Sequence, residues 1–335
     1  MKQTLVERAL NSGGKLTPLI VDNKETGGLG LCNPSIYKDN DEILMNVRNV
    51  SYTLHHCEGD MKFQTPWGPL NYVRPDYDAK LRTTNFLSKN NNYHKVDTSE
   101  FDLDPIWDFV GLEDARIVRW DGKLYYCGCR RDVKSDGQSR MEMSEIKIEG
   151  NTVREVSRVR IPATVKGSYC EKNWMPVLDM PYHFVKWTSP TEVVKVDPTP
   201  VKKYNKELGT KLTWAKSTKT IYHGESLIQG AEPRGSSQVI TIGDYRMAVT
   251  HDCVFWYNEK EDRDAEYLHQ FIVWDKDWNI VSSSPHWKFM NGKIEFCCGM
   301  AKDGEDILIT FGYQDNSAFL LRLPYHLVEK IIRGE

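Results

Sequence analysis

Hydrophobic and polar residues alternate along short stretches of this chain, most clearly in Gly111–Asp132, which reads GLEDARIVRWDGKLYYCGCRRD. Successive residues of an extended strand point to opposite faces, so in Leu124–Arg130 the side chains of Tyr125, Cys127 and Cys129 share one face. An Asp-Gly pair precedes this run, and Asp-Gly between two such runs is a strong hairpin signal. The stretch therefore predicts two strands joined by a tight turn.

The same plan, a polar turn followed by an apolar strand, recurs along the chain. Its five strands are expected to begin at Ile43, Leu124, Tyr182, Tyr245 and Ile307, at intervals of 81, 58, 63 and 62 residues. A repeat of about 60 residues holds four strands of ~5–6 residues with their loops. Repeats of short strands with Gly and Asp turns are typical of propeller blades. The pattern predicts an all-β fold, a five-bladed β-propeller, with two β-sandwich domains as the alternative.

We expect one domain over residues 1–335, with blades near residues 30–110, 111–170, 171–232, 233–293 and 294–325. Helical periodicity is confined to Leu5–Asn11 and the tail HLVEKIIRGE, which predicts a short C-terminal helix. The first interval is the longest, and its surplus lies in Thr53–Asp108, which is rich in aromatic residues. Long loops outside a repeat often bind ligands, so we interpret this range as an aromatic insertion between blades one and two.

Composition and charge change this picture little. The chain is 40% hydrophobic and 27% charged, with a net charge of −3, which argues against binding to nucleic acid or membrane by bulk charge. No apolar run approaches the ~20 residues that span a bilayer, and the N-terminus lacks the apolar core of a secretory signal. None of the eight cysteines forms a Cys-x-x-Cys pair, which favours free thiols over a zinc site. We expect a cytoplasmic protein with no metal or other cofactor.

A short polar motif precedes each repeated strand. Because the innermost strands of a propeller begin at one mouth of its channel, the five motifs are expected to converge there. They combine carboxylates, cations and hydroxyl or amide groups, a set that suits a polyhydroxylated ligand with an anionic group. The candidate site residues are Asn33, Ser35, Arg48, Glu113, Asp114, Arg116, Arg130, Lys172, Asn173, Arg234, His251, Tyr267, His269, Glu295 and Asp315.

Glu113 and Asp114 are adjacent, so in an extended strand they face opposite ways and cannot form a two-carboxylate pair. One carboxylate would therefore act alone. Asp114 and Arg116 share a face, and the arginine is expected to hold Asp114 ionised; a structural Asp–Arg bridge is the alternative interpretation. The chain has no dinucleotide-binding, Walker or Gly-x-Ser-x-Gly motif, which excludes three common enzyme classes.

GLEDARIVRWDGKLYY resembles the Glu-Asp-Pro-Arg signature of the β-mannoside phosphorylases of glycoside hydrolase family 130, which the β-1,2-mannosyltransferases of glycosyltransferase family 108 share. NPSIY, MNVRN, KNWMPV, VTHD and the final IEFCCGMAKDGEDILITFGYQDNSAFLLRL are similar to other parts of that pattern, so the resemblance spans roughly residues 30–322. It implies a five-bladed propeller and an inverting enzyme that acts on β-mannosides with one catalytic carboxylate.

The resemblance implies that Asp114 is the general acid and works through a hydroxyl of the bound sugar. The other implied roles are phosphate or donor contacts for Arg48, Lys172 and His251, and sugar contacts for Asn33 and Asp315.

Three departures from the family pattern fall on its phosphate side. Ala115 replaces the signature proline, Lys186 in YHFVKWTSP stands where phosphorylases carry a His-Arg-Pro phosphate contact, and Arg234-Gly-Ser-Ser differs from a proline-rich version. We therefore expect a glycosyltransferase-type enzyme that moves a mannose-like hexosyl unit between an anionic donor, a nucleotide sugar or sugar phosphate, and a glycan acceptor. A β-mannoside phosphorylase or hydrolase, and a non-catalytic glycan-binding propeller, are the alternatives.

Residues 202–219 carry six lysines and one tryptophan. We interpret this basic stretch as a solvated hairpin between blades three and four, with contact to a nucleic-acid-borne acceptor as the alternative. Homo-oligomerisation stays open, because the edges of a propeller can pack against a second subunit.

Overall fold

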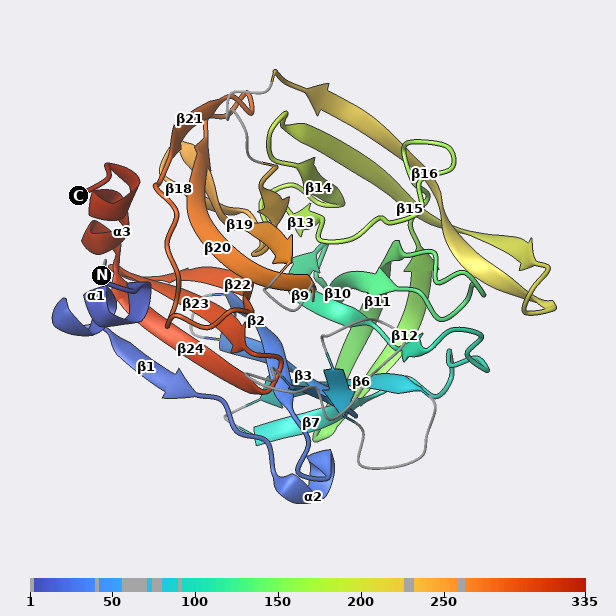
Figure 1. Cartoon of the computed structure of the whole chain (residues 1–335). Coiled ribbons are helices and arrows are strands. Elements are labelled where there is room, and N and C mark those ends of the chain that lie inside the picture. The colour runs from blue at the N-terminus through green and yellow to red at the C-terminus, as the bar shows by residue number, and fades with distance from the viewer. Residues whose placement is uncertain are drawn as a thin grey trace.

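The computed structural model describes residues 3–39, 42–55, 71–73, 80–89, 92–225, 232–257 and 263–335. These residues form twenty-four strands and three short helices. Most strands pair antiparallel with the next strand along the chain, and the resulting groups are arranged around a common centre (Figure 1). The prediction of an all-β fold with a short C-terminal helix is confirmed.

Within the described residues, antiparallel pairing arranges most strands in five groups, and short parallel pairings join the first three groups into one thirteen-stranded sheet. The first is β2 (Leu31–Asp39), β3 (Glu42–Val50), β6 (Leu81–Lys89) and β7 (Asn92–Asp97). The second is β9 (Glu113–Trp120), β10 (Lys123–Arg130), β11 (Arg140–Glu149) and β12 (Thr152–Arg160). The third is β13 (Met175–Pro176), β14 (His183–Trp187), β15 (Glu192–Asn205) and β16 (Thr210–His223).

In the fourth group, two short strands pair with successive parts of one long strand. It contains β17 (Arg234–Gly235), β18 (Ile240–Ile242), β19 (Tyr245–Tyr257), β20 (Arg263–Trp274) and β21 (Ile280–Ser283). The fifth group contains β22 (Glu295–Asp303), β23 (Asp306–Tyr313), β24 (Ser317–Pro324) and β1 (Lys15–Pro18). The short strand β8 (Phe109–Val110) pairs parallel with β6 of the first group. Strands β4 (Thr53–His55) and β5 (Asn71–Val73) pair only with each other among the described residues. The helices are α1 (Leu5–Asn11), α2 (Asn23–Thr26) and α3 (Tyr325–Ile332).

The five repeated strands begin within one residue of their predicted positions. They are β3, β10, β14, β19 and β23, which start at Glu42, Lys123, His183, Tyr245 and Asp306. The first strands of three groups, β2, β9 and β22, contact one another at the centre of the molecule (Figure 1). The polar motifs lie at the start of these inner strands, so the fold brings segments that are far apart in the sequence together.

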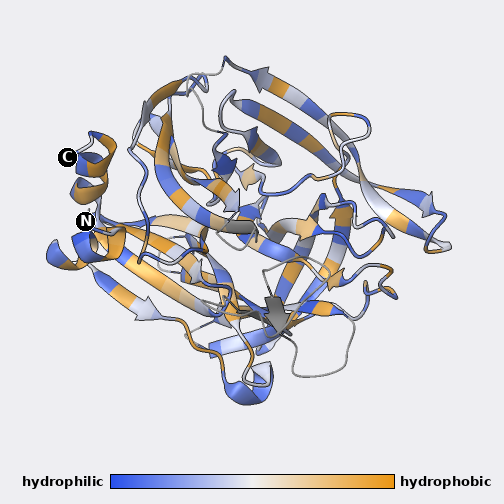
Figure 2. Cartoon of the chain, in the orientation of Figure 1, coloured by the Kyte–Doolittle hydropathy of each residue, from blue (hydrophilic) through white to orange (hydrophobic). Residues whose placement is uncertain are grey.

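The fifth group contains a strand that sequence analysis left outside it. β1 pairs antiparallel with β24, with Lys15 opposite Arg322 and Pro18 opposite Phe319. Helices α1 and α3 then pack on the same core as β23 and β24, and Figure 2 shows how hydrophobic these two strands are. The two ends of the described chain therefore complete one sheet together.

The predicted aromatic insertion, Thr53–Asp108, falls only partly within the described residues. Residues 56–70, 74–79 and 90–91 lie outside them, and the prediction is not tested there. The described remainder includes strands β6 and β7, and Phe86 has no exposed surface. At least this part of the range belongs to the first sheet and its core, so its aromatic content reflects packing rather than a loop.

Two smaller predictions can be compared with the structure. The basic stretch 202–219 lies on the β15–β16 hairpin, whose outer part is largely exposed, but this hairpin belongs to the third group and does not connect the third and fourth groups. The alternation in β10 holds, because Tyr125, Cys127 and Cys129 all pack into the core shared with Trp174 and Phe184 of the third group. The described cysteines are all free thiols. In the described part of the chain, no helix combines the length and hydrophobicity required to cross a membrane.

Candidate active site

Three of the polar motifs contain a residue with left-handed backbone geometry. Asn33, Asp114 and Asn173 have φ angles of 44°, 50° and 60°. Asn and Asp adopt this region more readily than other non-glycine residues. At the first two positions the strand also has one more residue than its partner, which is a β-bulge. Bulges re-aim side chains and are over-represented beside active sites, so the motif residues leave the regular in-and-out alternation here.

Asp114 is the centre of a polar cluster that joins the first two groups. Its Oδ1 accepts hydrogen bonds from Asn33 Nδ2 at 2.8 Å and from Arg48 Nη1 at 2.9 Å. Arg48 is itself fixed by hydrogen bonds to Thr83 Oγ1 at 3.1 Å and to the Tyr52 hydroxyl at 2.9 Å. The Asp114 side chain is 15% exposed, so the carboxylate is held in place and still reachable.

The surroundings of Asp114 favour its ionised form. Burial alone would raise the pKa of this carboxyl, but the charges of Arg48 and Arg116 and the hydrogen bond from Asn33 bring the pKa below its ordinary value. Glu113 lies close by, with Oε2 3.8 Å from Arg48 Nη2. Asp114 is therefore negatively charged at neutral pH.

The role expected for Arg116 is only partly correct. Its charge does lower the pKa of Asp114, yet Nη1 donates to the backbone carbonyl of Asp114 at 2.7 Å and not to the carboxylate. Nε donates to the Ser236 carbonyl at 2.8 Å and Nη2 to Asn173 Oδ1 at 3.4 Å. Arg116 has no exposed surface, so it positions the inner strands of three groups instead of contacting substrate.

Ser35 and Arg130 were predicted to bind substrate, and the structure gives both other partners. Ser35 is fully buried and donates to the carbonyl of Ala115 at 2.6 Å. Arg130 pairs with Glu142 and Asp132 at 3.0 and 3.1 Å, away from the carboxylate of Asp114. Ser35 is therefore a bridge between inner strands, and Arg130 belongs to an ion-pair network farther along β10.

Glu295 and His269 of the wider candidate set also have structural partners. The Glu295 carboxylate accepts three backbone N–H groups, from Phe289, Met290 and Gly292, at 2.6–2.9 Å. His269 is fully buried, and burial lowers its pKa to about 3. These two side chains shape the fourth and fifth groups rather than the cluster around Asp114.

A second part of the cluster comes from the third and fourth groups. His251 is stacked on Tyr267, with ring centroids 5.5 Å apart, and its Nδ1 lies 2.8 Å from Ser236 Oγ. Burial, and the nearby charges of residues that include Arg234 and Lys172, keep the pKa of His251 well below its usual range. His251 is therefore a neutral imidazole at physiological pH.

Lys172 and Arg234 are the cations of this second part. Lys172 is exposed and Arg234 is half-buried, and both influence the pKa of His251. Neither side chain forms an ion pair with a carboxylate among the residues that the structure describes. Two uncompensated cations near an ionised aspartate provide a place for an anionic group.

Asp315 lies within electrostatic reach of Asp114 and Glu113. Burial raises the pKa of Asp315 to about 6; Arg48 opposes this rise, and the two neighbouring carboxylates add to it. Asp315 also has a left-handed φ of 50°, in the turn between β23 and β24. The site thus holds two aspartates whose pKa values are pushed apart, a pattern typical of acid–base chemistry.

We expect the replacement of Asp315 by asparagine to change how stability depends on pH. The folded pKa near 6 exceeds the ordinary aspartate value of about 3.9, so this group stabilises the fold fully below about pH 4. That contribution is lost as the pH rises through about 6. Relative to wild type, Asp315→Asn should gain about 2–3 kcal/mol between pH 4 and 8, at 1.36 kcal/mol per pKa unit, measured by urea unfolding. Parallel profiles for the two proteins would contradict this.

Sequence reasoning missed Gln238, which joins four groups. Its side chain has no exposed surface. Nε2 donates to the carbonyls of Ile36 and Ile117, both at 2.8 Å, and Oε1 accepts from the N–H of Met300 at 3.1 Å. This single amide from the fourth group therefore connects β2, β9 and β22. The only signal in the sequence is the polar run RGSSQ ahead of an apolar strand.

Among the described residues, no three His, Cys, Asp or Glu side chains gather as potential metal ligands. Lys186, which the sequence placed at a phosphate contact, is buried and lies 3.7 Å from Glu171 and 3.6 Å from Glu192. The positive charge of Lys186 is therefore balanced by two neighbouring carboxylates.

The fold is similar to that of solved mannoside-processing enzymes, although no family model matches the chain and no curated protein matches its sequence. A β-1,2-mannobiose phosphorylase from Listeria innocua superposes with a TM-score of 0.51 at 11% identity, covering 92% of this chain and 93% of that one. A mannose phosphorylase from Leishmania mexicana, solved with phosphate, gives 0.50 at 10% identity, covering 98% and 94%. A GDP-Man-dependent mannosyltransferase from the same organism gives 0.49 at 11% identity, covering 93% and 89%. The first two structures show that this chain shares their fold.

Proposed function

We propose that this protein is an inverting carbohydrate-active enzyme that transfers a mannose-like hexosyl unit from an anionic donor to a hydroxyl of an acceptor. The observation that carries the proposal is the single ionised carboxylate of Asp114, held by Arg48 and Asn33 and still partly exposed. We also propose that the five strand groups are the blades of one propeller that spans residues 1–335.

An ionised Asp114 is suited to act as a base in the direction of transfer. The acceptor hydroxyl gives its proton to Asp114 while its oxygen attacks the anomeric carbon. The bond from that carbon to the donor's phosphate oxygen breaks, and the phosphate leaves with the electron pair. In the reverse direction the same carboxyl, now protonated, serves as the general acid that the sequence resemblance implied.

The two cations in the second part of the cluster, Lys172 and Arg234, favour an anionic donor. Lys172 and Arg234 carry charge without a carboxylate partner in the described chain, so they can stabilise the negative charge that develops on the leaving phosphate. His251 is neutral, and its imidazole can hydrogen-bond to the same group. Asn33 and Asp315 lie close enough to Asp114, by contact or by charge, to bind sugar hydroxyls.

A β-mannoside phosphorylase is the second candidate, because the two superposable neighbours are described as phosphorylases. In that reaction inorganic phosphate would occupy the place of the leaving group. Lys186 is paired with Glu171 and Glu192, so it is not available for the phosphate contact expected in a phosphorylase. For this reason, transfer from a donor to a glycan acceptor is our first choice.

A donor screen on purified protein tests the proposal. Nucleotide sugars, GDP-mannose among them, and sugar 1-phosphates are incubated singly with mannosides, and the release of nucleotide or phosphate is measured. Release from one nucleotide sugar, with formation of a longer glycan, is the result expected for transfer. Release from a sugar 1-phosphate alone would support the phosphorylase instead. Binding of mannosides with no turnover of any donor would indicate a non-catalytic propeller.

A further inference from the structure

The β19–β20 hairpin extends beyond the first strand of its own group. That strand, β17, begins at Arg234, which lies opposite His251 of β19. The residues of β19 after His251 therefore continue past the end of β17 at which the polar motif lies. In Figure 1, the end of β19 and the start of β20 lie toward the centre of the molecule. The hairpin thus leads outward from the residues of the candidate site.

The projecting part of β19 carries four consecutive large apolar residues that are exposed. Val254, Phe255, Trp256 and Tyr257 are 45%, 43%, 36% and 74% exposed. Because successive residues of a strand point to opposite faces, apolar side chains are exposed on both faces of the hairpin. An unbroken run of exposed apolar residues is avoided on ordinary protein surfaces and is typical of surfaces that bind a ligand or a partner.

One face of the hairpin is a row of rings that begins in the candidate site. The register of β19 and β20 is regular, so His251, Phe255 and Tyr257 share a face with Tyr267, which lies opposite Cys253. Tyr267 stacks on His251 there, with ring centroids 5.5 Å apart. Exposure rises outward along this face, from 2% at His251 to 74% at Tyr257. We call His251, Tyr267, Phe255 and Tyr257 the aromatic row.

The two faces of the hairpin differ in charge. On the face opposite the aromatic row, Asp252 Oδ2 lies 2.5 Å from His286 Nε2, and Glu266 pairs with Lys288. On the row itself, the low pKa of His251 leaves its imidazole neutral. The apolar C–H faces of sugar rings pack well on neutral aromatic rings. The aromatic row therefore suits an uncharged sugar chain better than it suits the anionic donor.

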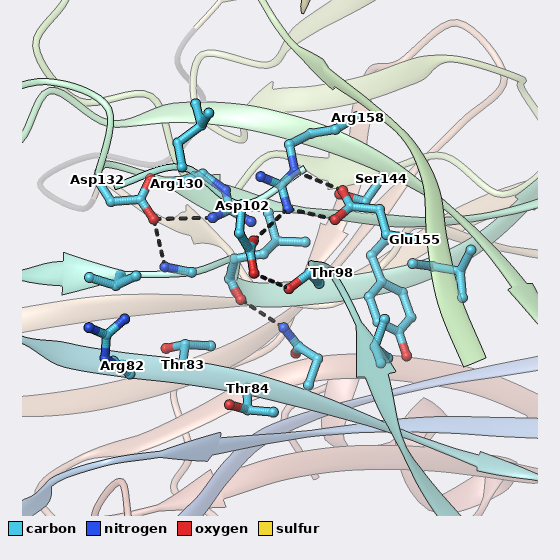
Figure 3. A pocket seen from close by; sticks show the side chains of 18 of the residues that line it. Arg82, Thr83, Thr84, Thr98, Asp102, Arg130, Asp132, Ser144, Glu155 and Arg158 are labelled. Carbon is cyan, nitrogen blue, oxygen red and sulfur yellow. Dashed lines mark hydrogen bonds and ion pairs between the residues drawn. The ribbon is translucent and has the colours of Figure 1, made fainter. Parts of the chain in front are cut away.

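The pocket between the first and second groups is less suited to such a chain. Its walls come mainly from β6, β7, β10, β11 and β12, and they include the exposed Arg82. Figure 3 shows that charged side chains of this pocket are held by one another, as in the 2.6 Å pair of Arg158 with Glu155. Asp114 does not line the pocket, so a sugar bound there would not contact the carboxylate of the proposed reaction.

From the position, the exposure and the neutral character of the aromatic row, we propose that it is an acceptor subsite that binds a mannose-like oligosaccharide along the hairpin. This inference rests on the proposed function and assigns its acceptor class, a chain of several sugar units. The segment from His251 to Tyr257 spans ~20 Å at ~3.3 Å per residue, which accommodates several sugar rings. The unit that receives the new sugar lies at the candidate site, and the preceding units pack on Phe255 and Tyr257.

Binding of mannosides of different length tests the inference. D-Mannose and a β-linked mannose tetrasaccharide are titrated into the full-length protein without a donor, by calorimetry or ligand-observed NMR. We expect the tetrasaccharide to bind at least about 10-fold more tightly than mannose, because its additional rings contact the aromatic row. Phe255→Ala and Tyr257→Ala should each weaken tetrasaccharide binding about 3- to 10-fold. In the double variant, the advantage of length should disappear.

Trp256→Ala is the matched control, because Trp256 is an exposed aromatic residue of the same hairpin on the opposite face. It should keep the full advantage of length, and thermal melts establish that all variants are folded. Equal affinity of the wild type for mannose and the tetrasaccharide would overturn the inference. So would an advantage that survives in the double variant, or one that Trp256→Ala abolishes. A wild-type dimer that the double variant converts to a monomer would also overturn it, because the row would then be an interface between two copies.

The donor screen separates this inference from the proposed function. Turnover of a donor by a protein that shows no advantage of length would overturn the acceptor subsite and leave the proposed function standing. An advantage of length in a protein that turns over no donor would contradict the proposed function and support the aromatic row as a glycan-binding surface.

Discussion

Replacing Asp114 with asparagine is expected to lower kcat by about 10²–10⁴-fold, the usual contribution of a general acid or base. Asparagine keeps the side-chain oxygen that accepts from Asn33 Nδ2 and Arg48 Nη1, so the local geometry should survive. What it loses is the ability to take a proton from the acceptor hydroxyl. Donor affinity should therefore change little, because in the proposed mechanism Lys172 and Arg234 bind the anionic group.

The measurement is the steady-state kinetics of whichever reaction the donor screen identifies, with donor binding followed by calorimetry. Asp303→Asn is the matched control, because Asp303 also pairs with basic side chains, Lys38 and Arg322, at the opposite end of β22. We expect its activity to stay within about twofold of wild type, since surface pairs contribute little. Unchanged turnover in Asp114→Asn would remove this residue from the mechanism.

The second large effect is on stability. Gln238→Leu should lower the free energy of unfolding by about 3–5 kcal/mol, because it leaves the carbonyls of Ile36 and Ile117 and the N–H of Met300 buried without partners. The two carbonyls and the N–H lie on β2, β9 and β22, so the substitution removes hydrogen bonds where the inner strands meet. Leucine is similar in size, so a cavity would account for little of the change.

Chemical denaturation measures this effect, and Gln270→Leu supplies the comparison. Gln270 is 3% exposed, and its Nε2 has no partner in the described chain. The same substitution there removes a buried donor that is already unsatisfied, so we expect a cost below about 1 kcal/mol. Equal destabilisation by the two variants would show that Gln238 acts through packing alone.

The strands could be predicted from the sequence because their signals are local. Turns of Asp and Gly and alternating apolar residues placed β10 and β19 within one residue. The approach of Asn33 to Asp114 was also foreseeable, because one polar motif recurs at the start of the inner strands, and Arg48 reaches Asp114 from near the end of β3. Local pattern and global fold agree in these elements.

Partner choice could not be predicted in the same way. Arg130 belongs to the same hairpin as Arg116, but it pairs with Glu142, which lies on the next strand. Gln238 bonds to carbonyls 202 and 121 positions away, and β1 joins the last sheet from the other end of the chain. Such contacts depend on how complete sheets pack, which no window of neighbouring residues contains.

The pairing of β1 with β24 has a consequence for biosynthesis. About 300 residues separate Lys15 from its partner Arg322, so at about 5–20 residues per second the ribosome delivers β24 on the order of 15–60 s after β1. During that interval the nascent β1 segment has no native neighbour, and the core shared by α1, α3 and β24 cannot assemble. The fifth sheet is therefore completed only after β24 has been synthesised, and the interval before that is when the nascent chain most needs protection from aggregation.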